Sequence, residues 1–438
     1  MKKTDMLIKK LILAIIIGIV LTGGSALAKE TMKLDNNLTL IYKNIPGVKV
    51  VSVQTWMKTG SVNETEKESG ISHFLEHMVF KGTAKYAPSE IDEIVESKGG
   101  VMNAATSKDY TFYYINIPSY NAETAFDTIS EMVFRAKFIP EEIEKEKPVV
   151  VQEIKRSYDS PTSKMWEEFS RQMFKGTPYA REIIGTEETV NSFDHDMLTD
   201  YYKRYYHPDN MTLVVVGDIS YDDVKALAKK YFSDKRDVPA GKRYDIKGLT
   251  KLDAPVEKIV GRDINQEYGI FSYPANGLLD VDLYSLEVLG EILSGGEFSV
   301  LNQKFRYDKD VTNSINAGYY GLRYNGTFLF TYNAPLGRGD LIKSEILDIV
   351  KNVSTYLTQE NIEKAKNRLK SQSVFQREKT SSEANDIGYS YTVGVPSYYD
   401  NFIENINKVD KMSIENTIGK IFSSDYVWMR TMPDKKSE

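Results

Sequence analysis

The feature that most constrains this chain is the stretch His73-Phe74-Leu75-Glu76-His77, which has the pattern H-x-x-E-H. Residues four apart lie on one face of an α-helix, so the imidazoles of His73 and His77 can converge on one ion. Glu76 follows His73 by three residues and lies on nearly the same face, within reach of a water on that ion. This pattern, in a chain with only four histidines, predicts a metal-binding helix rather than a helix with two partly buried histidines and a surface glutamate.

The donor types favour zinc. Zinc accepts imidazole nitrogens and carboxylate oxygens and, at hydrolytic sites, keeps a fourth position for water. Glu76 could take the proton of that water and so act as a general base. Manganese and cobalt accept similar donors, so the residues leave the metal in the cell open. The chain has no cysteine, which excludes thiolate ligands and thiol catalysis.

A third ligand has to come from elsewhere in the chain. The predicted helix from Glu141 to Ser157 carries five glutamates, but an acidic helix is usually just a solvated face, so spacing alone does not choose among them. Glu146 and Glu153 are seven residues apart and share a face, which is a weak reason to pair them as a metal ligand and a residue that supports a ligand. The two other histidines, His195 and His207, lie outside the motif and are expected to be structural.

The first 28 residues read as a secretory signal peptide. Four lysines lie among the first ten residues, an apolar run from Leu11 to Leu21 follows, and the segment ends in Ala26-Leu27-Ala28. The apolar run is short against the ~20 residues that span a bilayer, so cleavage after Ala28 is expected. The mature chain is then exported, either periplasmic or extracellular, and would meet a membrane only through an uncleaved signal segment.

Charge and composition limit the classes of molecule that this chain is expected to bind. The chain has 438 residues and a formal net charge of −6, and loss of residues 1–28 removes four lysines and one aspartate, which brings the mature chain near −9. An acidic surface disfavours nucleic acid and anionic membranes as partners. A chain of this length commonly forms two to three domains.

Strand and helix patterns alternate twice along the chain. The first series ends in a β-branched strand at Met211 to Gly217, and a polar linker leads to a second series whose last strand lies near Tyr426 to Thr431. We therefore predict an α+β fold of two related domains, each a mixed β-sheet packed with helices. The predicted boundaries are a signal peptide at 1–28, a zinc-binding domain at 29–235, a linker at 236–257 and a related non-catalytic domain at 258–438.

At this point the sequence resembles the pitrilysin- and insulinase-like zinc peptidases, which include mitochondrial processing peptidase-like proteins. The similarity covers nearly the whole mature chain and rests on several motifs in the same order. These are Gly70 to Met78, Gly99 to Ala104, Gln152-Glu153-Ile154, Pro178-Tyr179 with Ile184-Gly185-Thr186, His207 to Met211, and Val216-Gly217-Asp218.

The resemblance implies a clam-shell peptidase and supplies the third ligand. The family's distal zinc glutamate follows the second histidine by about 76 residues, and Glu153 stands there. Glu146 matches a family glutamate that contacts a metal ligand and not the metal itself. Pro148 departs from the pattern, and a proline inside this helix predicts a kink, which puts the geometry of Glu146 and Glu153 in doubt.

The resemblance also assigns residues that hold the substrate. In such enzymes an edge strand pairs with an extended peptide, and here that strand carries Asn103, Ala104, Ala105 and Thr106. The sequence alone favours an ordinary edge strand after the Gly99-Gly100 turn.

The second half departs from the family pattern at one position. The family's second substrate-binding element is an Arg followed seven residues later by a Tyr; Arg306 matches the Arg, but Asn313 stands at the Tyr position. In some two-chain members a partner supplies this Arg/Tyr pair. We therefore expect this chain to be the zinc-bearing half of a heterodimer.

The predicted function is that of a secreted zinc endopeptidase acting on short or unfolded polypeptides. One alternative is a non-catalytic assembly or binding subunit with the same fold, although the intact set of His73, Glu76, His77 and Glu153 disfavours it. Another is a metal-dependent hydrolase acting on something other than peptides, against which only the resemblance at the Asn103–Thr106 edge argues.

Overall fold

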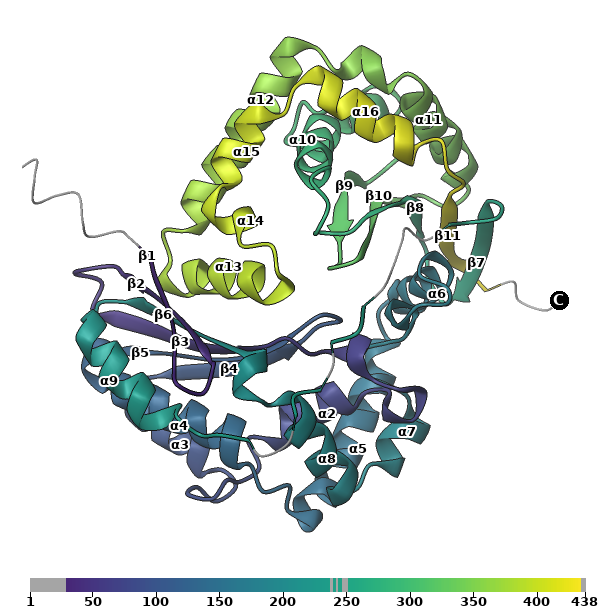
Figure 1. Cartoon of the computed structure of the whole chain (residues 1–438). Helices are drawn as coiled ribbons and strands as arrows, with labels where there is room; N and C mark the ends of the chain where they lie inside the picture. The colour runs from purple at the N-terminus through teal and green to yellow at the C-terminus, as the bar shows by residue number, and fades with distance from the viewer. Residues whose placement is uncertain (1–28, 237–238, 242, 246–250, 435–438) are drawn as a thin grey trace, which may run out of the picture.

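The structure is a computed structural model that describes residues 29–236, 239–241, 243–245 and 251–434. The predicted signal peptide and part of the predicted linker lie outside these residues. Within them the chain forms two halves, each with its own sheet, which face one another across the molecule (Figure 1). The predicted α+β class with two related mixed sheets is confirmed.

The first half is built on a six-stranded sheet in the order β1-β2-β6-β3-β5-β4. β2 and β6 run parallel and the other neighbours are antiparallel. Every residue of β6 is buried, as its run of β-branched residues predicts for a central strand. The strands are β1 (Lys29–Lys33), β2 (Thr39–Asn44), β3 (Val50–Met57), β4 (Val101–Thr106), β5 (Thr111–Pro118) and β6 (Met211–Gly217).

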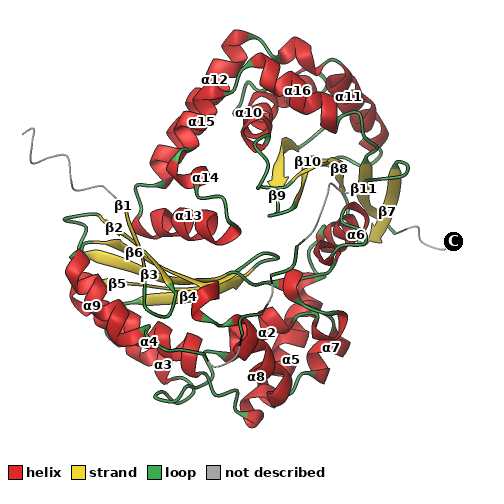
Figure 2. Ribbon diagram, viewed as in Figure 1, coloured by secondary structure: helices red, strands yellow, loops and turns green. Residues whose placement is uncertain are grey.

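Helices cover the lower face of this sheet as Figures 1 and 2 are drawn. A core of buried aliphatic and aromatic side chains fills the space between them. The helices of this half are α2 (Ile71–Met78), α3 (Glu90–Ser97), α4 (Ala122–Arg135), α5 (Pro140–Ser157), α6 (Ser163–Met173), α7 (Glu187–Ser192), α8 (His195–Tyr205) and α9 (Tyr221–Tyr231).

The second half repeats this topology with five strands in the order β7-β11-β8-β10-β9. β7 and β11 pair in parallel as β2 and β6 do, so β11 takes the place of β6 and β9 that of the edge strand β4. The predicted relation between the two halves is thereby confirmed. The strands are β7 (Val256–Arg262), β8 (Glu267–Asn276), β9 (Ser314–Gly321), β10 (Asn325–Ala334) and β11 (Val427–Pro433).

The helices of the second half pack around a second apolar core. They are α10 (Leu283–Ser294), α11 (Gly339–Lys351), α12 (Gln359–Gln376), α13 (Thr380–Val393), α14 (Ser397–Asp400), α15 (Phe402–Lys408) and α16 (Lys411–Ile421), together with a π-helical turn at Asn302–Asp308.

The two halves exchange a helix each. α13 of the second half packs on β3 and β6 of the first sheet, and α6 of the first half packs on β11 of the second. In Figure 1 α13 accordingly lies over the first sheet and α6 beside β11. Gly388 on α13 permits the close approach, since a Cβ there would come within 2.1 Å of Nε1 of Trp56. Each sheet is therefore covered in part by a helix of the other half.

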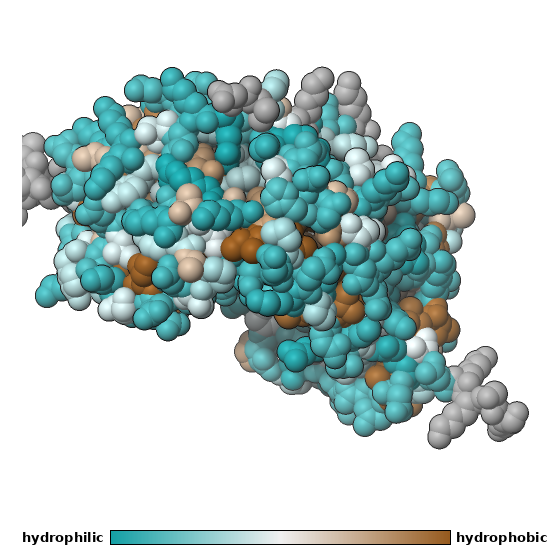
Figure 3. Space-filling model, turned by 90° about the horizontal axis from the view of Figure 1, so that it is seen from below, coloured by the Kyte–Doolittle hydropathy of each residue, from teal (hydrophilic) through white to brown (hydrophobic). Residues whose placement is uncertain are grey.

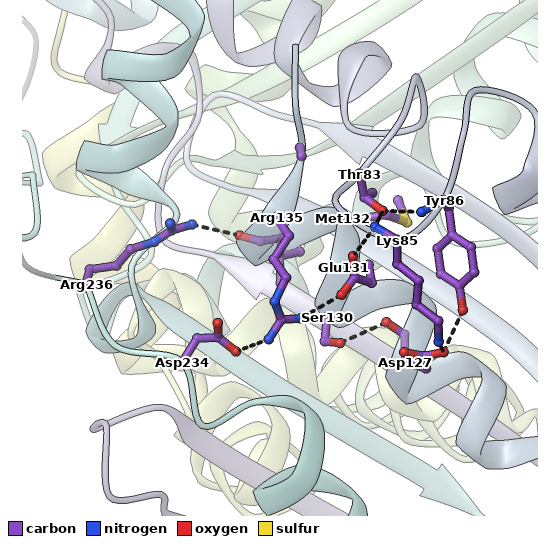
Figure 4. Close-up of polar contacts among 12 residues, drawn as sticks. Thr83, Lys85, Tyr86, Asp127, Ser130, Glu131, Met132, Arg135, Asp234 and Arg236 are labelled. Carbon is purple, nitrogen blue, oxygen red and sulfur yellow. Dashed lines mark hydrogen bonds and ion pairs between the residues drawn. The ribbon is translucent and has the colours of Figure 1, made fainter. Parts of the chain in front are cut away.

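A polar network ties α4 to the loop that follows the motif helix and to the end of the first half (Figure 4). Arg135 bridges Glu131 at 2.9 Å and Asp234 at 2.5 Å. The other oxygen of Glu131 accepts from the backbone N–H of Lys85 at 3.1 Å. Through these contacts α4 holds both the loop after α2 and the segment around Asp234, where the chain leaves the first half.

The face that carries the first-half helices is mostly hydrophilic, with small scattered apolar areas (Figure 3). None of the helices in the described part of the chain combines the length and apolar character that a bilayer crossing needs.

Candidate active site

The helix α2 holds the H-x-x-E-H residues and is only eight residues long. Its apolar side packs into the first core, through Ile71, Phe74, Leu75 and Met78. His73 and His77 stand on the less buried side, with ring centroids 4.8 Å apart. The predicted helix is thus present, and its two imidazoles share a face.

Glu153 of α5 completes a cluster with these histidines. One of its carboxylate oxygens lies 3.7 Å from Nε2 of His73, and the other lies 3.7 Å from Nε2 of His77. Among the described residues, these three form the one group of potential metal ligands whose donor atoms all lie within 4.8 Å of one another. α5 runs as one helix through Pro148, so the proline does not separate Glu146 from Glu153.

Glu146 lies behind this cluster and holds His77. Its Oε1 is 2.9 Å from Nδ1 of His77, and its Oε2 is 2.8 Å from Nζ of Lys81. A carboxylate at Nδ1 keeps the ring proton there and leaves the Nε2 lone pair free to face a metal. The two hydrogen bonds lower the pKa of Glu146, against the effect of its burial. Glu146 therefore acts on the candidate metal site through His77.

Glu76 faces the edge strand. The hydroxyl of Thr106 on β4 donates to its carboxylate at 2.5 Å. Burial raises the pKa of Glu76, an effect that the Thr106 hydrogen bond and the charge of His77 only partly oppose. A carboxylate whose pKa is moved toward neutrality is a better proton acceptor than an exposed one.

The two histidines differ in their surroundings. Burial lowers the pKa of His73 to about 4, so this ring is neutral at physiological pH. Burial also acts to lower the pKa of His77, but the hydrogen bond and charge of Glu146 outweigh it and raise the pKa. Nδ1 of His73 is buried and has no hydrogen-bond partner among the described residues.

The remaining predicted site residues lie on β4, which packs against α2, and in the second half of the chain. β4 is the last strand of its sheet, and Asn103 and Ala105 are exposed on it. In the second half Arg306 faces Glu297 at 3.9 Å, and the Asn313 side chain donates to Asn333 at 2.8 Å. Nothing in the described structure brings Arg306 and Asn313 into contact with the metal-ligand cluster.

The two remaining histidines have local partners, as expected of structural residues. His195 is half-exposed beside Asp196, and the Nδ1 of His207 accepts from the Asp209 N–H.

Two site residues were not predicted from the sequence: Lys81, which holds Glu146, and Glu64, which binds the start of α2. Thr106 was predicted as a site residue, but its hydrogen bond to Glu76 was not. Lys81 follows His77 by four residues, a spacing that could have indicated a shared face. Glu64 offers no such local signal.

Two family models and several known proteins match this chain. The family model described as Insulinase (Peptidase family M16) matches residues 39–187, and the model described as Peptidase M16 inactive domain matches residues 192–369. An uncharacterised zinc protease of Bacillus subtilis, YmxG, is 31% identical over 402 residues, covering 89% of this chain and 95% of that one. The chain belongs to the insulinase family, peptidase family M16. The resemblance inferred from the motifs is thereby confirmed.

Further proteins match most of this chain, one in sequence and two in fold. An uncharacterised zinc protease of Rickettsia bellii is 29% identical over 396 residues, covering 90% of this chain and 94% of that one. A Helicobacter pylori protease superimposes with a TM-score of 0.87 at 23% identity, over 93% of this chain and all of that one. A peptidase M16 inactive domain from Pseudomonas fluorescens superimposes with a TM-score of 0.85 at 16% identity, over 94% of this chain and 100% of that one. At these identities the two structures support the fold alone.

Proposed function

We propose that this insulinase-family chain is an exported zinc endopeptidase that cleaves short or unfolded polypeptides. His73, His77 and Glu153 would hold the zinc, and Glu76 would be the general base. The observation that carries the proposal is the convergence of three donors of the types that zinc prefers, with Glu76 on the same helix.

The donor spacing fits the size of the ion. Two donors about 2.1 Å from a tetrahedral zinc lie roughly 3.4 Å apart. The 3.7 Å separations between Glu153 and each Nε2 are close to this value. When bound, zinc would supply Lewis-acid polarisation of a peptide carbonyl and acidify a bound water.

The residues of the chain account for the remaining chemistry. The hydroxyl of Thr106 donates to one oxygen of Glu76 and so orients the carboxylate. Glu146 keeps the His77 proton on Nδ1, so the ring does not turn its N–H toward the ligand cluster. A polypeptide paired with the free edge of β4 would run past Thr106 and hence past Glu76. Only an extended chain can pair in this way, so folded proteins should be poor substrates.

The alternative of a non-catalytic subunit is less well supported. The inactive-domain model matches residues 192–369, whereas His73, Glu76, His77 and Glu153 all fall within residues 39–187, which match the insulinase model. The inactive description therefore applies to the half without the H-x-x-E-H residues.

Glu76→Gln tests the function directly. Peptide cleavage by the mature chain should be abolished by chelation and restored by zinc. The Glu76→Gln variant should bind zinc as the wild type does and lose cleavage by at least about 100-fold, the range of general-base catalysis. Wild-type rates in this variant would exclude Glu76 as the base.

The proposal includes a homologous partner subunit. Asn313 bonds to Asn333 and presents no phenol, so a partner carrying an Arg/Tyr pair would complete the site. Mixing the mature chain with an exported homologue that has the pair but a broken H-x-x-E-H motif should raise the cleavage rate. Full activity of the purified chain alone would argue against this assembly.

Export is proposed on the signal-peptide pattern. N-terminal sequencing of the secreted or periplasmic protein should give Lys29 as the first residue.

A further inference from the structure

A buried glutamate, Glu64, binds the start of the helix that carries the histidines. Its side chain is nearly inaccessible, with a residue exposure of 4%. Its Oε2 accepts from the N–H of Gly70 and its Oε1 from the N–H of Ser72, both at 2.9 Å. These two donors lie at the N-terminus of α2, where backbone N–H groups have no partner within the helix.

The position of α2 depends on such anchors because the helix is short. Eight residues are too few for a helix to be stable without tertiary contacts. A carboxylate at its N-terminus satisfies two donors at once and interacts favourably with the helix dipole. Ser72 is also the residue directly before His73, so the clamp lies one residue from the first ligand.

The surroundings of Glu64 keep the clamp rigid. Arg181 donates to the backbone carbonyl of Glu64, and the Ser72 hydroxyl contacts the Tyr201 hydroxyl at 2.8 Å. Gly70 has a φ of 92°, and a Cβ on it would come within 2.6 Å of the Ile184 carbonyl. The backbone on both sides of the clamp is therefore closely packed.

Burial raises the pKa of Glu64 to about 7, although the hydrogen bonds from Gly70 and Ser72 oppose the shift. A neutral cap such as Ser or Asn could satisfy a helix N-terminus without burying a carboxyl group. A carboxyl group, unlike those caps, offers two acceptor oxygens, and here each accepts one backbone N–H.

We propose that Glu64 is a positioning residue of the metal site. By holding two N–H groups of the first turn of α2, it sets the distance from Nε2 of His73 to Glu153. This inference rests on the proposed zinc site, but it concerns the affinity and geometry of that site and not the reaction.

Glu64→Gln is the test, because glutamine has the same shape but replaces one acceptor oxygen by an NH₂ donor. That NH₂ would face one of the two backbone donors. Zinc affinity of the full mature chain, measured by competition with a chromophoric chelator, should fall about 10-fold, as for other residues that orient ligands. The visible spectrum of the cobalt-substituted protein, which reports ligand geometry, should change, and kcat should fall with KM unchanged.

Glu68→Gln is the matched control. Glu68 lies in the same loop and accepts from Thr65 N–H at 3.0 Å and from Arg204, but it does not contact α2. Its zinc affinity and cobalt spectrum should equal those of the wild type. If Glu64→Gln does not fold, Glu64→Asp, whose shorter side chain cannot span both donors, is measured against the same criteria.

Unchanged zinc affinity and an unchanged cobalt spectrum in the Glu64 variant would overturn the inference. An equal loss in Glu68→Gln would also overturn it, since the effect would then belong to the loop. The two proposals fail separately: a wild type that binds zinc but cleaves no peptide refutes the proposed function, while the effect of Glu64 on metal binding stands.

Discussion

Nδ1 of His77 lies 2.9 Å from Oε1 of Glu146, and this contact decides which nitrogen of the ring can face a metal. The same glutamate binds Lys81 through its other oxygen. The series of polar contacts Lys81–Glu146–His77 thus joins α2 to α5 behind the candidate ligand cluster.

Removing this support should weaken the metal site. Glu146→Ala should reduce zinc affinity by about 10- to 100-fold, because His77 loses the acceptor that orients it. Glu146→Gln, which keeps an acceptor but not the charge, should lie between Glu146→Ala and the wild type. Glu144→Ala, on the exposed side of the same helix, is the control and should have no effect. Equal affinities across all four proteins would refute the role of Glu146.

The hydroxyl of Thr106 should matter for turnover and not for metal binding. Thr106→Val preserves the shape and the backbone pairing of β4 but removes the hydrogen bond to Glu76. We expect kcat to fall about 10-fold, a modest share of general-base catalysis, with zinc content unchanged. Thr31→Val, an exposed threonine on the strand at the opposite edge of the sheet, is the control. A loss of zinc in Thr106→Val would contradict this assignment.

The contact between the halves should depend on a buried ion pair. Lys43 on β2 contacts Glu383 on α13, whose side chain is fully buried. Lys43→Met leaves that carboxylate without its charged partner, with the Tyr399 hydroxyl still donating to it, and should destabilise the protein by about 3 kcal/mol, measured by urea unfolding. The exposed pair Lys408–Glu404 provides the comparison, and Lys408→Met should change stability by less than about 0.5 kcal/mol. Similar small effects of both substitutions would show that the pair is not important for docking α13.

Stability should fall as the pH rises from about 5 to 7 because of Glu287. Burial raises the pKa of this carboxyl to about 7, against the hydrogen bond from Tyr398. The unfolded chain has already released this proton near its ordinary pKa of ~4.3. The folded chain therefore holds more protons in this window, and the unfolding free energy declines by up to about 1.4 kcal/mol per pH unit.

Glu287→Gln should remove the part of this slope that Glu287 contributes, whereas Glu64, whose pKa burial also raises to about 7, keeps its own part. The unfolding free energy of the variant minus that of the wild type should be larger at pH 8 than at pH 5, by on the order of 2 kcal/mol. Thermal unfolding of both proteins at four pH values between 5 and 8 measures this. Glu415→Gln, at a half-exposed site on α16 where the carboxylate pairs with Lys411, should leave the wild-type slope unchanged. Parallel pH profiles for wild type and Glu287→Gln would refute the assignment.

The parts of the site that could be predicted are those that depend on local spacing. The face shared by His73 and His77 follows from helical geometry, and the family motifs pointed to Glu153 across 76 residues. For the second half the sequence predicted alternating strands and helices but not the order of the strands in the sheet, in which β11 lies between β7 and β8.

The contacts of Thr106 and Glu64 with α2 had no such signal. Each joins residues from different elements, and a hydroxyl or carboxylate in a loop or strand is compatible with many partners. The exchange of α6 and α13 between the halves escaped prediction for a similar reason. An amphipathic helix has the same periodic pattern whichever sheet it covers.

The amino-acid order alone therefore specified the helix with its two histidines and base, because those residues lie within one turn and a half of each other. The folded chain supplied the rest: the approach of Glu153 to both Nε2 atoms, the support of His77 by Glu146, and the anchoring of α2 by Glu64. These distances depend on how helices and loops far apart in the sequence pack around one core, and close packing, unlike periodicity, is a property of the whole chain.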